Sequence, residues 1–317
     1  MMRIMQYSLI LLASYNSLAA WSVQSLVDSV KSNVPFGKKE VVRPFTQEFD
    51  LTGKKILIIE NPKGALEVKA EWNTPKLYMH SVVKAKTAPE LDHMHIDAHP
   101  QGNDRFVIRT VSSSPSSGSA YVDHKIIVPA HVQVYIVSNQ SNIMLSSIKN
   151  PVKITLDNGS ISAHNAQGNL TALIKGSGSI KVAHAHQPFN FKVNKGTISI
   201  AKAEKGGVAY VDSGSITVEQ AYVNGIQSLQ LTSGYGDITL GLPISTNADI
   251  KASTGKGTIF CDHPITLKPF TAKLTPQTWK QMQLHVNGTL GTGEAIITAN
   301  TNKGNIKIKE VIEQVKI

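Results

Sequence analysis

The amino-acid sequence predicts an all-β protein, namely a single-stranded right-handed parallel β-helix (β-solenoid) with coils of about 18–22 residues. Three observations predict this fold: a short phrase that recurs along the chain, a turn-forming residue that opens each copy, and an isoleucine that follows at a fixed distance. One such unit cannot bury its own apolar edge, so the copies are expected to stack. The right-handed sense rests on the general preference of parallel crossovers.

Each copy of the phrase opens with a tight turn. The residue two positions before the central glycine is always Asp, Asn or Gly, as at Asp157 and Asn194. These residues close Asx turns or accept positive φ. The spacing between successive glycines is 19, 18, 18, 22, 21 and 47 residues. The predicted structural turn glycines are Gly159, Gly178, Gly196, Gly214, Gly236, Gly257 and Gly304.

A strand with one inward face follows each turn. The residue two positions after the glycine is an isoleucine in every copy, and a second small or aliphatic residue stands two positions further on. This period of two is typical of a half-buried strand. The predicted core ladder is Ile161, Ile180, Ile198, Ile216, Ile238, Ile259 and Ile306. We expect the first six of these side chains to form one buried stack.

The N-terminal segment has the features of a secretory signal peptide over residues 1–20. Arg3 supplies the positive start, a short apolar run follows from Ser8 to Ala13, and small residues stand near Ala20. The apolar run is too short to span a bilayer. Residues 21–50 contain several breakers, among them Pro35 and Pro44, and are predicted to be a linker. The mature protein is therefore expected to be exported to the periplasm, the outer surface or the medium.

The β-helix domain is predicted over residues 51–309, beginning with an irregular N-terminal β region. Regular coils are expected at about 132–261, because Asn139–Ile143 repeats the phrase with Ser141 in place of glycine. Residues 262–293 contain three prolines and are expected to form an irregular excursion or a small hairpin. Residues 294–309 are expected to form the last coil, and residues 310–317 a C-terminal tail.

The segment Ile59–Gly64, the strand into Val128-Pro129 and the tandem Ser-Gly-Ser-Ile phrases together resemble the bacterial putative-adhesin family. The resemblance covers about Leu51 to Lys309. It implies a secreted or envelope protein of β-helix fold with no catalytic motif to carry over. It implies surface exposure more than any particular ligand.

Candidate metal ligands occur on one predicted strand. His93, His95, Asp97 and His99 alternate along it and share one face, and imidazole with carboxylate suits zinc or copper. Side chains on one strand are too parallel for all four to reach one ion, so a partner strand would have to contribute, and a solvated polar face is the alternative. His184 and His186 form a second pair at the same spacing.

Charge and composition bound the function. The net charge is +10, and loss of residues 1–20 removes Arg3 and no acid, which leaves +9. This favours an anionic polymer, a glycan or a membrane surface as the partner, or simply solubility. Basic clusters interleaved with aromatic residues are absent from the sequence, so nucleic acid is not expected. One cysteine excludes an internal disulfide framework.

Two functions follow as hypotheses. The first is an exported, non-enzymatic adhesin or surface-binding protein with no cofactor and no catalytic residues. The second is a secreted carbohydrate-active enzyme, which would need two or more close carboxylates in a groove. Only six acids lie between Pro151 and Cys261, and Asp157 and Asp212 already have a turn role, which favours the first. A scaffold acting with a membrane regulator remains a third reading.

Overall fold

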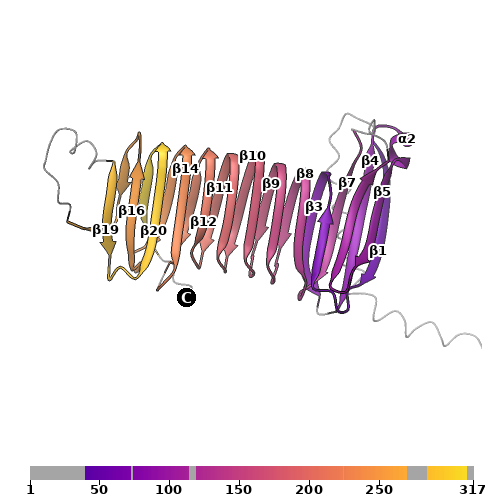
Figure 1. Ribbon diagram of the computed structural model, residues 1–317, viewed down its shortest axis with the longest axis horizontal. Coiled ribbons are helices and arrows are strands. Elements are labelled where there is room, and N and C mark those ends of the chain that lie inside the picture. Colours follow the sequence, from indigo (N-terminus) through magenta and orange to yellow (C-terminus); the bar gives the residue numbers. More distant parts are fainter. Residues whose placement is uncertain (1–39, 73, 114–118, 224, 270–283, 313–317) are drawn as a thin grey trace, which may run out of the picture. The chain divides into compact units, whose positions relative to one another are not determined.

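The computed structural model describes residues 40–72, 74–113, 119–223, 225–269 and 284–312. The predicted signal peptide, residues 21–39 of the predicted linker, residues 270–283 of the predicted excursion and residues 313–317 of the predicted tail lie outside these ranges. All described strands belong to the unit formed by residues 41–317. The described residues are all-β apart from the short helix α2 (Ala88–Asp92), and their strands stack side by side (Figure 1).

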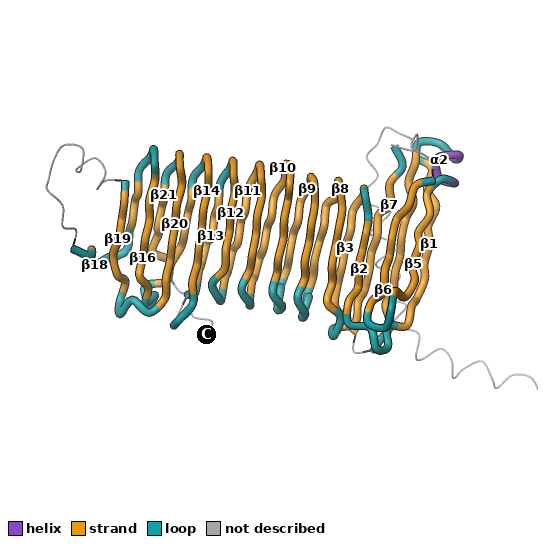
Figure 2. Tube along the Cα trace, in the orientation of Figure 1, coloured by secondary structure: helices purple, strands orange, loops and turns teal. Residues whose placement is uncertain are grey.

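The central coils are single bent strands that pair in parallel with their neighbours. In order, β8 pairs with β9, β9 with β10 and β10 with β11, and like positions of the repeat lie side by side. Short loops join one coil to the next (Figure 2). The bounds are β8 (Gln133–Ser146), β9 (Val152–His164), β10 (Leu170–Ala185) and β11 (Phe189–Ala203).

The later coils divide at the turn into two strands. We call the strand before the turn glycine the first half of the coil and the strand after it the second half. First halves pair with first halves and second halves with second halves, always in parallel. The coils are β12 (Gly207–Ser213) with β13 (Ile216–Ala221), β14 (Ser228–Tyr235) with β15 (Ile238–Pro243), β16 (Ala248–Thr254) with β17 (Ile259–Cys261), and β20 (Ala295–Lys303) with β21 (Ile306–Val311).

The core lies between the two halves. In β9 the first half buries Val152, Ile154 and Leu156, and the second half buries Ile161 and Ala163. This alternation continues along the stack, because each half turns every second side chain inward. The isoleucine column is fully buried at Ile161, Ile180, Ile198, Ile216, Ile238 and Ile306.

Ile259 departs from the expected buried stack. Its side chain is only partly buried, because β17 is a three-residue strand paired with β21 and lies at the end of the column. The neighbouring Cys261 is half-buried, and burial raises the pKa of its thiol.

The turn glycines stack on one another. Gly159, Gly196 and Gly214 have φ between 132° and 140°, a region that favours glycine. A Cβ placed on Gly196 would lie 1.7 Å from the carbonyl oxygen of Gly178 in the preceding coil. Two constraints, backbone conformation and the close approach of coils, therefore act at the same position.

The order of coils in space differs from their order in sequence. The coil β20–β21 was expected to follow the others, but it lies between β14–β15 and β16–β17. Figure 1 shows the yellow strand β20 between β14 and β16. Ile306 thus fills the place beside Ile238 that Ile259 was expected to occupy. The insertion also explains the long gap before Gly304.

The stack begins upstream of residue 132, which corrects the predicted start of the regular coils. Strands β2 (Ile56–Glu60) and β3 (Lys63–Trp72) pair in parallel with β8, and Gly64 lies beside Ser141. Strands β6 (Arg105–Ser112) and β7 (Tyr121–Pro129) then pair in parallel with β2 and β3. These four strands of the region predicted to be irregular are therefore coil-like.

Antiparallel strands cover this end of the stack. β5 (Met94–Gln101) pairs with β6, β4 (Lys76–Ala85) pairs with β7, and β1 (Val41–Asp50) pairs with β4. β1 falls within residues 21–50, so the predicted linker is wrong for its last ten residues. Pro44 is accommodated there because β1 is an edge strand.

An antiparallel pair lies at the other end. β19 (His285–Leu290) pairs with β16, and β18 (Thr266–Leu267) pairs with β19. This agrees with a small hairpin packed on the stack, within the range predicted as an excursion. β21 extends to Val311, so the predicted tail overlaps the last strand by two residues, Glu310 and Val311.

Candidate functional site

One edge of the stack carries a continuous column of polar side chains, each immediately before a glycine-column position. Most successive members lie in strand register with each other, for example Lys63 with Gln140, and Tyr235 with Lys303. The backbone N–H of Ser177 donates to Asn158 Oδ1, and the backbone N–H of Gly304 donates to the carbonyl of Lys256. All members are exposed except Lys63, which is half-buried. We call this set the turn-edge column: Lys63, Gln140, Asn158, Ser177, Lys195, Ser213, Tyr235, Lys303 and Lys256.

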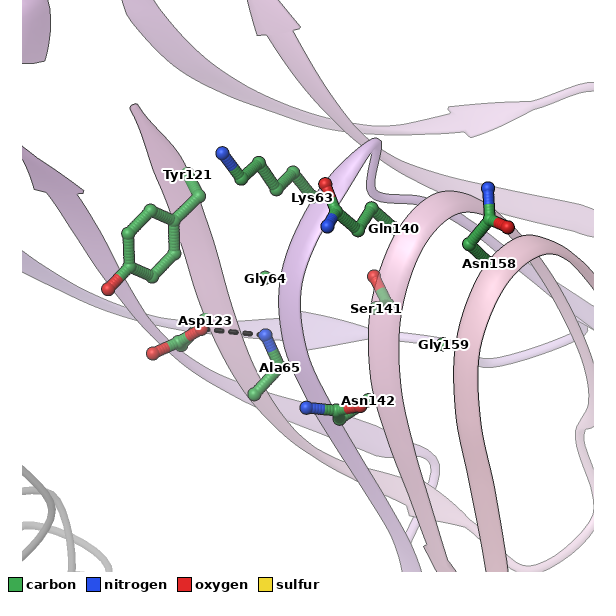
Figure 3. Close-up of a pocket in the computed structure, with 10 residues that line it drawn as sticks. All are labelled: Lys63, Gly64, Ala65, Tyr121, Asp123, Gln140, Ser141, Asn142, Asn158 and Gly159. Carbon is green, nitrogen blue, oxygen red and sulfur yellow. Dashed lines mark hydrogen bonds between the residues drawn. The ribbon is translucent and has the colours of Figure 1, made fainter. Parts of the chain in front are cut away.

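A pocket of about 390 Å³ lies at the first end of the turn-edge column. Figure 3 shows Lys63, Gln140 and Asn158 on neighbouring turns, with Tyr121 and Asp123 on an adjacent strand. The remaining lining residues are Gly64, Ala65, Ser141, Asn142 and Gly159.

The pocket forms where the glycine turns end. β3 pairs with β7 from Leu66 onward, and β6 ends at Ser112 while β7 begins at Tyr121, so among the described residues no turn glycine lies in register beside Gly64. The backbone of β7 still packs tightly, because a Cβ on Gly64 would lie 2.1 Å from the carbonyl oxygen of Val122. The amide of Asn61 donates to the same oxygen at 2.9 Å and ties the turn to β7.

Hydrogen bonds and charges fix the pocket wall formed by β7. Asp123 Oδ1 accepts from the backbone N–H of Ala65 at 2.7 Å, and Asp123 Oδ2 lies 2.8 Å from Lys84 Nζ. The ammonium groups of Lys84 and Lys63 lie 5.7 and 6.0 Å from the ring centroid of Tyr121. Both ammonium groups are therefore within reach of a cation–π interaction with this ring.

This set of side chains suits a polar ligand with many hydroxyl groups. Gln140 offers amide donors and an acceptor, and Tyr121 offers an aromatic ring. Asn142 and Asn158 offer their amide NH2 groups, because their Oδ1 atoms already accept hydrogen bonds from Ser160 and Ser177. Lys63 adds positive charge at the rim. No such pocket was predicted from the sequence, although Ile59–Gly64 carried part of the family resemblance.

The predicted metal strand lies elsewhere. His95, Asp97 and His99 are on β5, while His93 caps the C-terminal end of α2. His99 Nδ1 lies 3.0 Å from Asp97 Oδ1, and His93 Nδ1 lies 3.3 Å from Ser113 Oγ. Within the described ranges, these histidines do not converge as three ligands on one point.

The second histidine pair does converge with an acid. His184 and His186 meet Glu204, which the sequence analysis did not connect to them. Burial raises the pKa of Glu204, but hydrogen bonds from His186, His184 and Lys202 outweigh it and bring this pKa down to about 2. Glu204 follows β11, and its side chain contacts residues of the preceding coil. The contact joins residues about 20 positions apart, so a short sequence motif could not predict it.

No helix among the described residues is long and apolar enough to cross a membrane.

Several solved structures resemble this chain at low identity. A putative adhesin from Bacteroides fragilis is 12% identical, covers 85% of this chain and 97% of its own, and has a TM-score of 0.46. A putative cell adhesion protein from Clostridium sporogenes is 13% identical, covers 86% and 100%, and has a TM-score of 0.28. A putative lipid binding protein from Parabacteroides distasonis is 11% identical, covers 86% and 97%, and has a TM-score of 0.27.

No curated protein matches the chain. Residues 54–309 match the model of the Toastrack DUF4097 family, nearly the same residues as the resemblance found in the sequence. The resemblance to the bacterial putative-adhesin family is confirmed, and the chain belongs to the Toastrack DUF4097 family.

Proposed function

We propose that this protein is an exported, non-enzymatic binding protein of the bacterial envelope that holds an anionic glycan along its turn edge. The observation that carries the proposal is the turn-edge column, which runs along the stack and ends in the pocket of Figure 3. Its aromatic, amide, hydroxyl and lysine side chains match the groups of an acidic polysaccharide.

The spacing of the column supports an extended ligand. Paired strands lie about 4.8 Å apart, so successive members of the column repeat at that interval. This interval is close to the length of one sugar unit in an extended polysaccharide. Tyr235 is 60% exposed midway along the column and offers a ring on which a sugar could lie.

Charge supports an anionic ligand. Lys195, Lys256 and Lys303 are exposed in the column, and the whole chain has a net charge of +10. Separate exposed charges attract a polyanion through a field that salt screens over about 8 Å at physiological ionic strength. Binding should therefore weaken as salt rises.

The lining of the pocket favours binding over hydrolysis. Among its described lining residues the single carboxylate is Asp123, and this group is already engaged by Ala65 and Lys84. Glycoside hydrolysis generally needs two carboxyl groups flanking the bond. A carbohydrate-active enzyme is therefore the second hypothesis.

The proposal includes export of the protein and a right-handed sense of its coils. The signal-like segment at residues 1–20 supports export to the periplasm, the surface or the medium. N-terminal sequencing of exported protein should begin near Ala20 or Trp21, and an intact Met1 on cytoplasmic protein would contradict export. We also expect the coils to wind in the right-handed sense that parallel crossovers prefer.

Binding to a panel of acidic and neutral polysaccharides, at low and high salt, tests the proposal. We expect retention on acidic glycans that falls with salt, and no release of reducing ends. Tyr121→Ala should weaken binding roughly tenfold, equivalent to about 1.4 kcal/mol. Tyr78→Ala, on β4, is the matched control and should not change it. Release of reducing ends would support the enzyme instead, and equal retention on neutral glycans would contradict the role of charge.

A further inference from the structure

A cluster of metal-ligating side chains stands apart from the pocket. His184 and His186 lie near the end of β10, and Glu204 follows β11 in the next coil. His184 Nε2 lies 2.7 Å from Glu204 Oε1, and His186 Nδ1 lies 2.7 Å from Glu204 Oε2. The three ligand atoms lie within 4.8 Å of one another.

The other nitrogen of His186 is also held by an oxygen. His186 Nε2 lies 2.8 Å from Asn165 Oδ1, which stands in the preceding coil. A neutral imidazole has one N–H, so with Nε2 donating to Asn165 the Nδ1 atom presents a lone pair. That lone pair faces a carboxylate oxygen, and two acceptors at this distance repel unless a proton or a cation lies between them.

Two features argue for a cation. The rings of His184 and His186 are tilted by 32° with centroids 3.7 Å apart, so one nitrogen of each ring reaches the same carboxylate. A hydrogen bond from the non-ligating nitrogen to a carbonyl oxygen is the usual outer-shell support of a metal-bound histidine. Asn165 supplies that support, and its φ of 55° fixes the local turn.

We propose that His184, His186 and Glu204 bind a divalent transition metal, with zinc as the cation that best fits two imidazoles and one carboxylate. Zinc bonds to nitrogen at about 2.0–2.1 Å, which places neighbouring ligand atoms roughly 3.3 Å apart in a tetrahedron. The observed spacing needs only small side-chain movements to reach this arrangement. All three residues are partly exposed, so water or an anionic ligand can fill the fourth position.

One nearby charge opposes the metal. Lys202 Nζ lies 3.2 Å from Glu204 Oε1 and 5.0 Å from the ring centroid of Tyr222. A bound dication would displace this ammonium from the carboxylate toward the ring, where it keeps a favourable contact. Lys202→Gln is therefore expected to tighten zinc binding.

The site would link successive coils at the edge opposite the glycine turns. His184 and His186 belong to one coil and Glu204 to the next, so the metal would join two coils directly. Asn165 in the coil before them would be joined through its hydrogen bond to His186. A ligand that binds only the folded state raises its melting temperature as concentration exceeds Kd. Zinc should therefore raise the melting temperature of the intact protein.

Zinc titration of the metal-free full chain by calorimetry tests the site, with cobalt as a spectroscopic probe. We expect one zinc per chain, a cobalt spectrum typical of four-coordinate geometry, and a rise in melting temperature. His184→Gln, His186→Gln and Glu204→Gln should each lower zinc affinity at least tenfold. Asn165→Gly, which accepts the positive φ, should lower it by about tenfold or more through loss of the outer-shell bond.

His95→Gln is the matched control, because His95 is an exposed histidine on β5 outside the cluster. It should leave zinc affinity unchanged, and the cluster variants should keep the metal-free melting temperature of the parent. Absence of saturable zinc binding would overturn the proposal. So would unchanged binding in the three cluster variants, or an equal loss in His95→Gln.

Discussion

Ile238 lies in register beside Ile306, and Ile306 in turn lies beside Ile259, the isoleucine that follows Ile238 in the repeat. The coil that comes last in the chain is therefore inserted between two coils that are consecutive in sequence. This coil pairs with a neighbouring coil on each side. β20 pairs with β14 and β16, and β21 pairs with β15 and β17. Its contacts are long-range, so they form late relative to local ones.

The position of Ile306 predicts an asymmetry in stability. Ile306→Ala removes a fully buried side chain between two others and should lower the free energy of unfolding by about 2–5 kcal/mol. Ile259→Ala makes the same change in a partly buried side chain at the end of the column and should cost less than half as much. Chemical denaturation of both variants measures the difference. Equal losses would contradict the inserted position of the coil.

The glycine column predicts a second difference. Gly196→Ala should lower stability by at least about 3 kcal/mol, because it combines an unfavourable φ with a Cβ 1.7 Å from the Gly178 carbonyl oxygen. Gly53→Ala is the control, since Gly53 has a φ of 72° and open space around the added atom. It should cost about 1 kcal/mol from the backbone conformation alone. Thermal unfolding of the two variants separates the steric contribution from the conformational one.

A buried histidine predicts how stability depends on pH. The His124 ring lies between Ser81 Oγ at 2.7 Å and Thr110 Oγ1 at 2.9 Å, and burial lowers its pKa to about 4. The unfolded chain binds a proton near pH 6.5, whereas the folded chain does so only near pH 4. The stabilisation is therefore complete above pH 6.5 and is lost as the pH falls toward 4.

The loss from this group should reach on the order of 3 kcal/mol. Burial also lowers the pKa of His80, so protonation of His80 adds to the loss of stability at low pH. Denaturation at several pH values measures the slope, and His124→Gln should flatten it. His131→Gln, at an exposed position, should leave the slope unchanged. A slope that survives His124→Gln would assign the effect to other groups.

The repeat made the coils predictable, because the turn glycine and the isoleucine two positions later recur in register. The order of the coils was not predictable, since the phrase at Gly304 is the same whichever coils it joins. The coil at Gly64 was missed because Leu66 stands where the other copies have isoleucine, and because 77 residues separate Gly64 from its neighbour Ser141. β1 was missed because an edge strand tolerates Pro44, which was interpreted as a breaker.

For the candidate sites too, features inside the repeated phrase could be predicted, and features that depend on contacts between coils could not. The turn-edge column occupies a position inside the repeated phrase, so its members could be found from sequence, although their exposure on one edge could not. The pocket lies between the turn at Gly64 and the start of β7, and Glu204 meets His184 only across coils. Both depend on stacking, which composition and local spacing do not specify.

The most direct test of glycan binding along the turn edge compares two double variants. Lys195→Ser with Lys303→Ser removes two charges from the turn-edge column. Lys153→Ser with Lys251→Ser removes two charges from the outward face of β9 and β16, both exposed. Affinity for an acidic polysaccharide should fall at least about tenfold in the first and less than about twofold in the second. Equal losses in both would show attraction by net charge alone and contradict a binding edge.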